Sequence, residues 1–422
     1  MISKSDIPIV GVIKLLASHG IEAGYLVPTQ TAMEKSICDA HSSLRDYFKK
    51  TNIHDYEKQG QGSENKVVLD VHLITDNSII KTKMSLYRPP TKLGDPRIWI
   101  YGLNEYAVPF NLLAIFQSNN IIYIFNASND KILKQPKNNK YQTPDLFSSL
   151  NEIQIDLAPT DNSPLNKILV NEEKSFDEIE LELIDKLKKI SKLGFVNSLR
   201  SGDTGVGMTL ETLLGIRANS NRAPDFHGIE IKAKRGTGNN KKTSNRVNLY
   251  SQVPNWKKSE CKTGMEILKK YGYVDSTSNR LQLYCTNSNV TNPQGLYLNV
   301  DEQSGILESL HKGQNNISKV VVWELDNLKK QLEIKHKKTF WVKANSIKNG
   351  LEEKFHYIEI EKTHSPLSSN LPTLIEIGAV TMDYTLSQKP VGNSARDHGY
   401  LFKIHPDNFD LLFPPTKIIS LI

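Results

Sequence analysis

One short segment, RAPDFHGIEIKAKR at residues 222–235, sets three charged side chains in an otherwise apolar stretch. Apolar residues recur at every second position from Ile229 onward, as in a strand with one buried face. Side chains two residues apart in a strand point to the same side, so Glu230 and Lys232 share a face. Asp225 lies just before this strand and directly after a proline. We therefore expect the three charges to converge at one end of the strand.

Two carboxylates held close together repel each other unless a cation lies between them. Mg²⁺ takes oxygen ligands and keeps several waters, so Asp225 and Glu230 suit it as ligands. Lys232 would then orient a metal-bound water or neutralise charge that develops on a phosphate. This is the chemistry of metal-dependent phosphodiester hydrolysis. An exposed strand with an ordinary Glu–Lys pair explains the same residues, because D-x4-E-x-K also occurs by chance.

The chain has 422 residues, too many for one ordinary hydrophobic core, so we expect two domains. No apolar run approaches the roughly 20 residues that a membrane-spanning helix needs. The three cysteines are scattered, and the first residues lack the features of a signal peptide. These features predict a cytoplasmic protein that does not associate with membranes.

The net charge of +7 is unevenly distributed along the chain. Residues 1–175 carry 19 basic and 19 acidic side chains, which leaves 34 basic against 27 acidic in the remainder. An excess of this size favours a polyanionic partner, but it is also common in proteins that bind none.

The composition and residue pattern of the sequence change twice, which divides the chain into three parts. Residues 1–150 contain alternating apolar runs and predict a β-rich domain with helical edges. Residues 151–175 are polar and interrupted by prolines, which is typical of a linker. Residues 176–422 open with an amphipathic helix and form the predicted second domain.

Individual elements follow from local signals. The first domain is predicted to begin with helices at about residues 8–17 and 30–50, and the alternation across 111–126 predicts a β-hairpin. Ser175 and Glu178 have the spacing of a capping box at the start of the first helix of the second domain.

The stretch GDTGVGMT at residues 202–209 nearly matches a phosphate-binding loop. Met208 stands where that loop needs a lysine, so we favour a glycine-rich turn that leads into the helix MTLETLLGI. A nucleotide-hydrolysing P-loop protein remains an alternative. Glu211 lies on this helix beside an apolar face, where a lone glutamate is usually solvated.

The segment 204–232 as a whole resembles a known family. P-D-x4-E-x-K is the signature of the PD-(D/E)xK nucleases, and TGVGMTLETLLGIRANSNRAPDFHGIEIK is similar to the metal-site region of the MvaI/BcnI type II restriction endonucleases and their relative MutH. In that group a helix carries a glutamate in an L-E-x-x-L-G context fourteen residues before the aspartate, the spacing from Glu211 to Asp225 here. Met208 departs from the lysine often found at its position. The resemblance extends over roughly residues 180–415.

The resemblance implies an α/β fold with a restriction-endonuclease-like PD-(D/E)xK core, in which helices flank a mixed central sheet, and a separate N-terminal β-rich α+β domain. It implies that Asp225, Glu230 and Glu211 bind Mg²⁺, for which Mn²⁺ would substitute. Lys232 would activate water or stabilise the phosphate. All four residues would belong to the catalytic centre.

The implied activity is Mg²⁺-dependent hydrolysis of double-stranded DNA at a short specific sequence by a type II restriction endonuclease. A monomer that cuts one strand at a time, and a cognate DNA methyltransferase in the host, are expected with it. Two alternatives stay open. One is a MutH-like nicking or methylation-dependent endonuclease, and the other is a DNA-binding regulator that does not cleave.

The segment RDHGYLFKIH at residues 396–405 resembles the part of the family that reaches the recognition sequence. Arg396 can bind guanine N7 and O6, Asp397 can accept from cytosine N4, and His398 can donate or accept. A surface turn before a strand would look the same.

Lys343 and Lys234 are candidate contacts to DNA phosphates, although solvated lysines explain them equally well. The N-terminal domain carries no catalytic constellation. Other restriction enzymes with an extra β-rich domain use it to bind DNA or an effector, so we expect a role in specificity, methylation sensing or autoinhibition.

Overall fold

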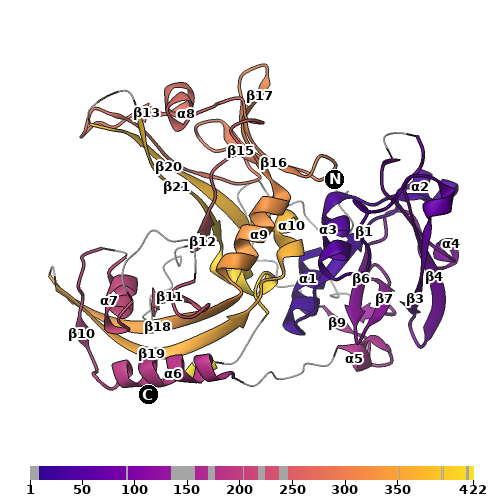
Figure 1. Ribbon diagram of the computed structural model, residues 1–422, viewed down its shortest axis with the longest axis horizontal. Coiled ribbons are helices and arrows are strands. Elements are labelled where there is room, and N and C mark those ends of the chain that lie inside the picture. The colour runs from indigo at the N-terminus through magenta and orange to yellow at the C-terminus, as the bar shows by residue number, and fades with distance from the viewer. Residues whose placement is uncertain are drawn as a thin grey trace.

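The computed structural model describes residues 9–91, 94–134, 157–169, 176–202, 204–216, 224–236, 246–350, 352–390, 392, 394–414 and 418–422. The N-terminal elements lie on one side of the molecule, and the elements after residue 176 form the larger remainder (Figure 1). No helix within these ranges is long and apolar enough to span a membrane.

A seven-stranded sheet organises the N-terminal part, in the order β1-β6-β7-β3-β4-β5-β2. Its neighbours pair antiparallel except β3 and β7, which run parallel. Its strands are β1 (Ala23–Leu26), β2 (Cys38–Asp39), β3 (Val67–Ile74), β4 (Ile79–Tyr87), β5 (Arg97–Ile100), β6 (Leu113–Ser118) and β7 (Ile121–Asn126). Its helices are α1 (Ile9–Ser18), α2 (Gln30–Lys35), α3 (Ser42–Lys50) and α4 (Leu103–Tyr106).

Two local predictions for this part have opposite outcomes. The hairpin across 111–126 is confirmed, because Asn119 and Asn120 both adopt positive φ, as the tight turn between β6 and β7 requires. The single helix at 30–50 is wrong. Ser36 ends α2 in a left-handed conformation, and Cys38 then pairs with β5.

The predicted linker at 151–175 is structured where it is described. Residues 157–169 contain β9 (Ala158–Pro159), which pairs with β8 (Leu133–Lys134), and α5 (Leu165–Ile168). Ser175, proposed as a capping residue, lies outside the described residues. The capping box is formed two residues later, by Asp177 and Glu180.

The elements after residue 176 form three further sheets. One has the order β10-β19-β18-β11 with β22 also paired to β19, the second has the order β12-β21-β20-β14-β13, and the third has the order β15-β16-β17. The strands are β10 (Val196–Asn197), β11 (Glu230–Arg235), β12 (Val247–Ser251), β13 (Tyr273–Val274), β14 (Leu281–Asn287), β15 (Leu296–Asp301), β16 (Ile306–Lys312), β17 (Ile317–Glu324), β18 (Lys338–Asn349), β19 (Glu352–His364), β20 (Val380–Gln388), β21 (Ala395–Ile404) and β22 (Ile418–Ser420). The helices are α6 (Glu178–Ser191), α7 (Gly205–Leu213), α8 (Gly264–Tyr271), α9 (Leu325–Lys335) and α10 (Leu371–Glu376), with the 3₁₀ turns η4 (Ser368–Asn370) and η5 (Pro406–Leu411).

The sheet that contains β11 is mixed, because β11 runs parallel to β18 while β19 runs antiparallel to it. On one face, Ile231 and Phe340 pack with buried residues of α6 and α7. On the other face, Trp341 joins the core that includes Leu328 and Leu332 of α9. A mixed sheet flanked by helices confirms the predicted α/β class of this part.

The N-terminal and C-terminal parts share one hydrophobic core. Val12, Ile13 and Leu16 of α1 belong to the same continuous cluster of buried side chains as Leu412 and Phe413 near the C-terminus. The N-terminal part is therefore not packed as an independent unit, and its separation as a domain stays a prediction.

Candidate active site

A two-residue reverse turn explains the spacing between Asp225 and Glu230. Phe226 and Ile229 exchange backbone hydrogen bonds of 2.9 and 2.8 Å. Between them, His227 has a φ of 45° and Gly228 a φ of 91°, both in the left-handed region. Because a hairpin aligns the residues that flank its closing pair, Asp225 comes to lie beside Glu230 at the start of β11.

Asp225 is held in place by the backbone of the strand that it precedes. Its Oδ2 accepts a hydrogen bond of 2.9 Å from the N–H of Ile231. Burial, and then the charge of Glu230, raise the pKa of Asp225 above its ordinary value, although this hydrogen bond and nearby lysines oppose the shift. The ionised side chain is thus destabilised in the protein without metal.

Glu230 is completely buried and lies between two lysines. Its Oε1 is 2.6 Å from Nζ of Lys232, and its Oε2 is 2.9 Å from Nζ of Lys335. Neither contact has the directional geometry of a hydrogen bond. A buried carboxylate is costly unless it is paired, and here two ammonium groups supply the compensating charge.

Lys335 was not predicted from the sequence. It is the last residue of α9, and its side chain is 18% exposed. It lies seven positions after Leu328 and three after Leu332, so it is on the inner face of the helix with these buried leucines. This helical spacing predicts that Lys335 faces the interior, but it does not predict that Glu230 is the residue it contacts.

Glu211 joins this group from α7, which packs against β11 through Leu210 and Ile231. Burial raises the pKa of Glu211, and the negative charge of Asp225 raises it further. Glu211 is therefore close enough to Asp225 to repel it, as the L-E-x-x-L-G resemblance implied. The structure brings all four predicted catalytic residues into one neighbourhood.

The donor chemistry of this neighbourhood fits a hard divalent cation. Burial raises the pKa of both Asp225 and Glu211, and a neighbouring carboxylate raises each further: Glu230 acts on Asp225, and Asp225 acts on Glu211. A cation would relieve these effects. The described residues contain no three His, Cys, Asp or Glu side chains already arranged to hold a metal. The assignment of Asp225, Glu230 and Glu211 as metal ligands thus remains a prediction. To bind a metal, Glu230 would have to give up its contact with Lys232 or Lys335.

The predicted base-reading residues lie at the exposed start of β21. Arg396 and His398 line a cavity of about 230 Å³ together with Arg280 and Tyr284. Asp397 does not line it. Instead its Oδ1 accepts a hydrogen bond of 2.6 Å from the N–H of Gly399, so it also shapes its own strand.

The two predicted phosphate contacts, Lys234 and Lys343, are register partners on β11 and β18. Their Nζ atoms lie 3.6 Å from carboxylate oxygens of Glu361 and Glu359, respectively, on β19. These are loose, partly exposed ion pairs, and such pairs contribute little to stability.

A model of the MvaI/BcnI restriction endonuclease family matches residues 184–413, more than half of the chain. The chain belongs to the MvaI/BcnI restriction endonuclease family. It is accordingly a site-specific deoxyribonuclease. The match includes the catalytic neighbourhood and the start of β21, and it leaves the N-terminal sheet outside.

One solved structure agrees with this assignment at the level of the fold. Restriction endonuclease MvaI in complex with its cognate DNA substrate aligns with a TM-score of 0.50 and 21% identity, over 59% of this chain and 100% of that one. MvaI in the absence of DNA aligns over the same shares with a TM-score of 0.36 and 22% identity. No curated protein matches the chain.

Proposed function

We propose that the chain is an Mg²⁺-dependent type II restriction endonuclease that hydrolyses both strands of DNA at a short specific sequence. The observation that carries this proposal is the turn at His227 and Gly228. It aligns Asp225 with Glu230 beside Lys232, in the segment that resembles the family's metal site.

In this proposal the carboxylates bind the metal and a lysine acts on the water and the phosphate. Asp225, Glu230 and Glu211 are the oxygen donors for the metal, which when bound would polarise the scissile phosphate and lower the pKa of a water. Lys232, 32% exposed and beside Glu230, is the proposed group that orients this water and neutralises charge on the phosphate. Because both carboxylates bind a metal in their ionised form, and their pKa values are raised, metal affinity should fall as the pH drops toward those values.

The arrangement of two long hairpins supports a duplex as the substrate. The β18–β19 hairpin belongs to the sheet that holds the catalytic strand, and the β20–β21 hairpin carries Arg396 and His398 (Figure 1). The two hairpins diverge from the centre of the molecule (Figure 1), and in this proposal the duplex contacts both of them. Arg396 and His398 would read base edges, while Lys234 and Lys343 would contact phosphates.

The direct test is digestion of unmethylated phage DNA with Mg²⁺ by the native protein and by Lys232→Ala. We expect discrete fragments from the native protein, and none from the variant or after EDTA is added. Asp185→Asn, on the exposed face of α6, is the matched control and should leave the fragments unchanged. Absence of cleavage on both unmethylated and methylated DNA, with binding retained, would instead indicate a regulator.

The same digest on supercoiled plasmid separates the proposal from a MutH-like nicking enzyme. A monomer with one catalytic centre should produce a nicked intermediate that later becomes linear, whereas a nicking enzyme stops at the nicked circle. Cleavage of methylated DNA alone would identify a methylation-dependent enzyme. Protection of the site by methylation would support a cognate methyltransferase in the host.

A further inference from the structure

We propose that Lys335 is a positioning residue of the catalytic centre, and that the N-terminal part of the chain sets its place at Glu230 through α9. Lys335 contacts Glu230 from one face of α9, and the N-terminal part contacts another face of the same helix. The family model does not cover that N-terminal part, so it assigns no role to it.

Helix α9 has three distinct faces. Leu325, Leu328 and Leu332 are buried in the common core, and Lys335 continues this inner face. Lys330 and its neighbours on the opposite face are exposed. Lys329 and Glu333, four residues apart, form the third face, and this face is turned toward α3 of the N-terminal part.

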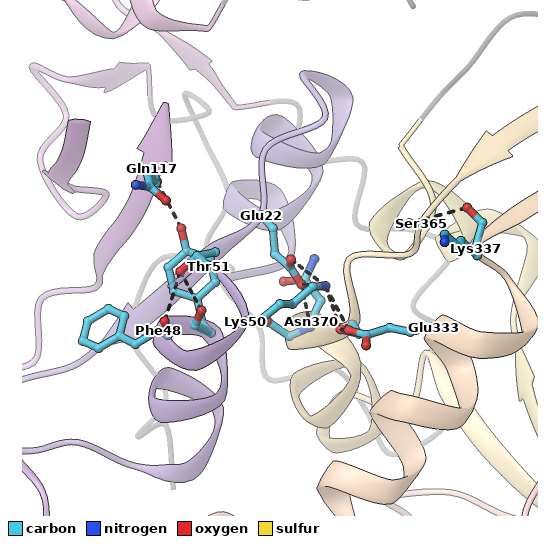
Figure 2. A network of polar contacts seen from close by, with 12 residues as sticks. Glu22, Phe48, Lys50, Thr51, Gln117, Glu333, Lys337, Ser365 and Asn370 are labelled. Carbon is cyan, nitrogen blue, oxygen red and sulfur yellow. Dashed lines mark hydrogen bonds and ion pairs between the residues drawn. The ribbon is translucent and has the colours of Figure 1, made fainter. Parts of the chain in front are cut away.

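Ion pairs join α3 to this third face. Lys329, only 7% exposed, pairs with Asp46, and Nζ of Lys50 lies 3.1 Å from Oε1 of Glu333. Lys50 also lies 2.8 Å from Glu22 of its own part, so it bridges the two parts of the chain (Figure 2). Lys329 is nearly buried, whereas Lys50 and Glu333 are partly exposed, so these contacts join the two parts mainly as a network of several charges, which counts for more than an isolated surface pair.

A short turn of the C-terminal part closes this network. Ser368, in η4, receives a hydrogen bond of 2.9 Å from Nζ of Lys50 and donates one to Glu333. The next residue, Ser369, donates its backbone N–H to Glu22 at 2.8 Å. Lys50 is thus held from three sides, and any displacement of α3 would pull on Glu333.

The C-terminal end of α9 is fixed independently by His336, which is completely buried. Its Nε2 lies 2.9 Å from the carbonyl oxygen of Leu249, and its Nδ1 lies 3.0 Å from Oγ1 of Thr339. Nε2 must therefore donate, and the ring is neutral because burial lowers its pKa to about 3. With this end held, contacts along the side of α9 govern its rotation and hence the direction of Lys335.

The position of Lys335 matters because it occupies an oxygen of Glu230 that a metal would need. An ammonium group at 2.9 Å from that oxygen repels an incoming divalent cation and takes up space beside the oxygen. This step rests on the proposed function. Loosening Lys335 should therefore ease metal binding, and so should loosening α3 from α9.

Chemical labelling of Lys335 tests the coupling without metal, DNA or cleavage. The full chain is treated with acetic anhydride, and mass spectrometry gives the labelling of Lys335 relative to exposed Lys330 on the same helix. We expect Lys50→Met or Asp46→Asn to raise this ratio about threefold or more, as Glu230→Gln should. Lys134→Met is the control, because Lys134 and its partner Asp161 lie on neither α3 nor α9. An unchanged ratio in both folded interface variants would overturn the coupling.

The Mg²⁺ concentration for half-maximal cleavage tests the positioning role. Lys335→Met should lower it about threefold or more, and Lys335→Arg should restore it because the charge returns. The double variant Lys50→Met/Lys335→Met should match Lys335→Met alone, since the interface acts only through Lys335. An unchanged requirement in Lys335→Met, or full additivity, would overturn the proposal. A chain that never cleaves but whose labelling responds would refute the proposed Mg²⁺-dependent cleavage and leave the coupling standing.

Discussion

Asp225 and Glu230 are neighbours because the turn between them closes at Phe226 and Ile229, with His227 and Gly228 at its tip. The four intervening residues of the D-x4-E motif are thus a structural requirement of the catalytic strand. Any change that opens the turn should separate the two carboxylates while leaving both in the sequence.

Gly228→Ala should therefore impair cleavage through the backbone alone. A Cβ at Gly228 meets no atom within 4 Å, so the cost arises from its φ of 91° and should be about 1 kcal/mol. Gly194→Ala is the matched control, since Gly194 also has a positive φ and open space around it. Both variants should lose similar stability in thermal unfolding, but only Gly228→Ala should lose cleavage rate.

Asp225→Asn should make the metal-free protein more stable and abolish cleavage. Burial and Glu230 raise the pKa of Asp225, so its ionised form costs free energy at neutral pH, and a neutral amide removes that cost. The amide oxygen of the substituted side chain can still accept the hydrogen bond from the N–H of Ile231. We expect Tm to rise by about 1 to 2 °C in EDTA.

Asp185→Asn provides the contrast, because a hydrogen bond with Lys189 lowers the pKa of Asp185. That variant should not gain stability. A lower Tm for Asp225→Asn would show that its charge is already compensated in the absence of metal.

Arg396→Ala should relax sequence discrimination. A bidentate arginine–guanine contact contributes about 1 to 3 kcal/mol against the wrong base, equivalent to roughly 5- to 150-fold. The measurement is the ratio of cleavage rates on a cognate duplex and on duplexes with one substituted pair. If the ratio is unchanged at every position, Arg396 does not read a base.

Lys343→Met should weaken DNA binding equally for all sequences. Loss of one phosphate contact should reduce the slope of log K against log salt by about one. Binding titrations at several salt concentrations measure this slope. A change in sequence preference without a change in slope would contradict a phosphate contact.

Glu376 should make the protein less stable as the pH rises. Burial, and then the charge of Glu302, raise its pKa from 4.5 to about 7. The folded state therefore holds a proton that the unfolded state has lost between these values, and stability falls by at most about 1.4 kcal/mol per pH unit across this window. Urea unfolding at pH 4.5 and 7.5 should show a smaller loss in Glu376→Gln than in the native chain. Equal losses would mean that Glu376 titrates normally.

Sequence reasoning succeeded where the relevant contacts are local. The hairpin at 111–126, the catalytic strand at Glu230 and the helix that carries Glu211 all follow from short-range patterns or from motif spacing. The predicted helix at 30–50 failed because pairing of Cys38 with β5, far along the chain, outweighed helical periodicity.

Contacts between residues far apart in the sequence could not be predicted, because they leave no local pattern. The contact of Lys335 with Glu230 depends on how α9 crosses the sheet, and a lysine on an amphipathic helix is ordinarily solvated. Val12 and Ile13 share one buried cluster with Phe413 from the other end of the chain. No pattern in either segment indicates which other segment it packs with.

That common core has a consequence for how the enzyme can be divided. A chain cut before α6 would expose to water the surface at η5, including buried Leu411, against which α1 packs. The shorter protein would be prone to aggregate, and its inactivity would reveal nothing about regulation. Transferring this N-terminal part to another nuclease would likewise need a recipient with a complementary apolar face.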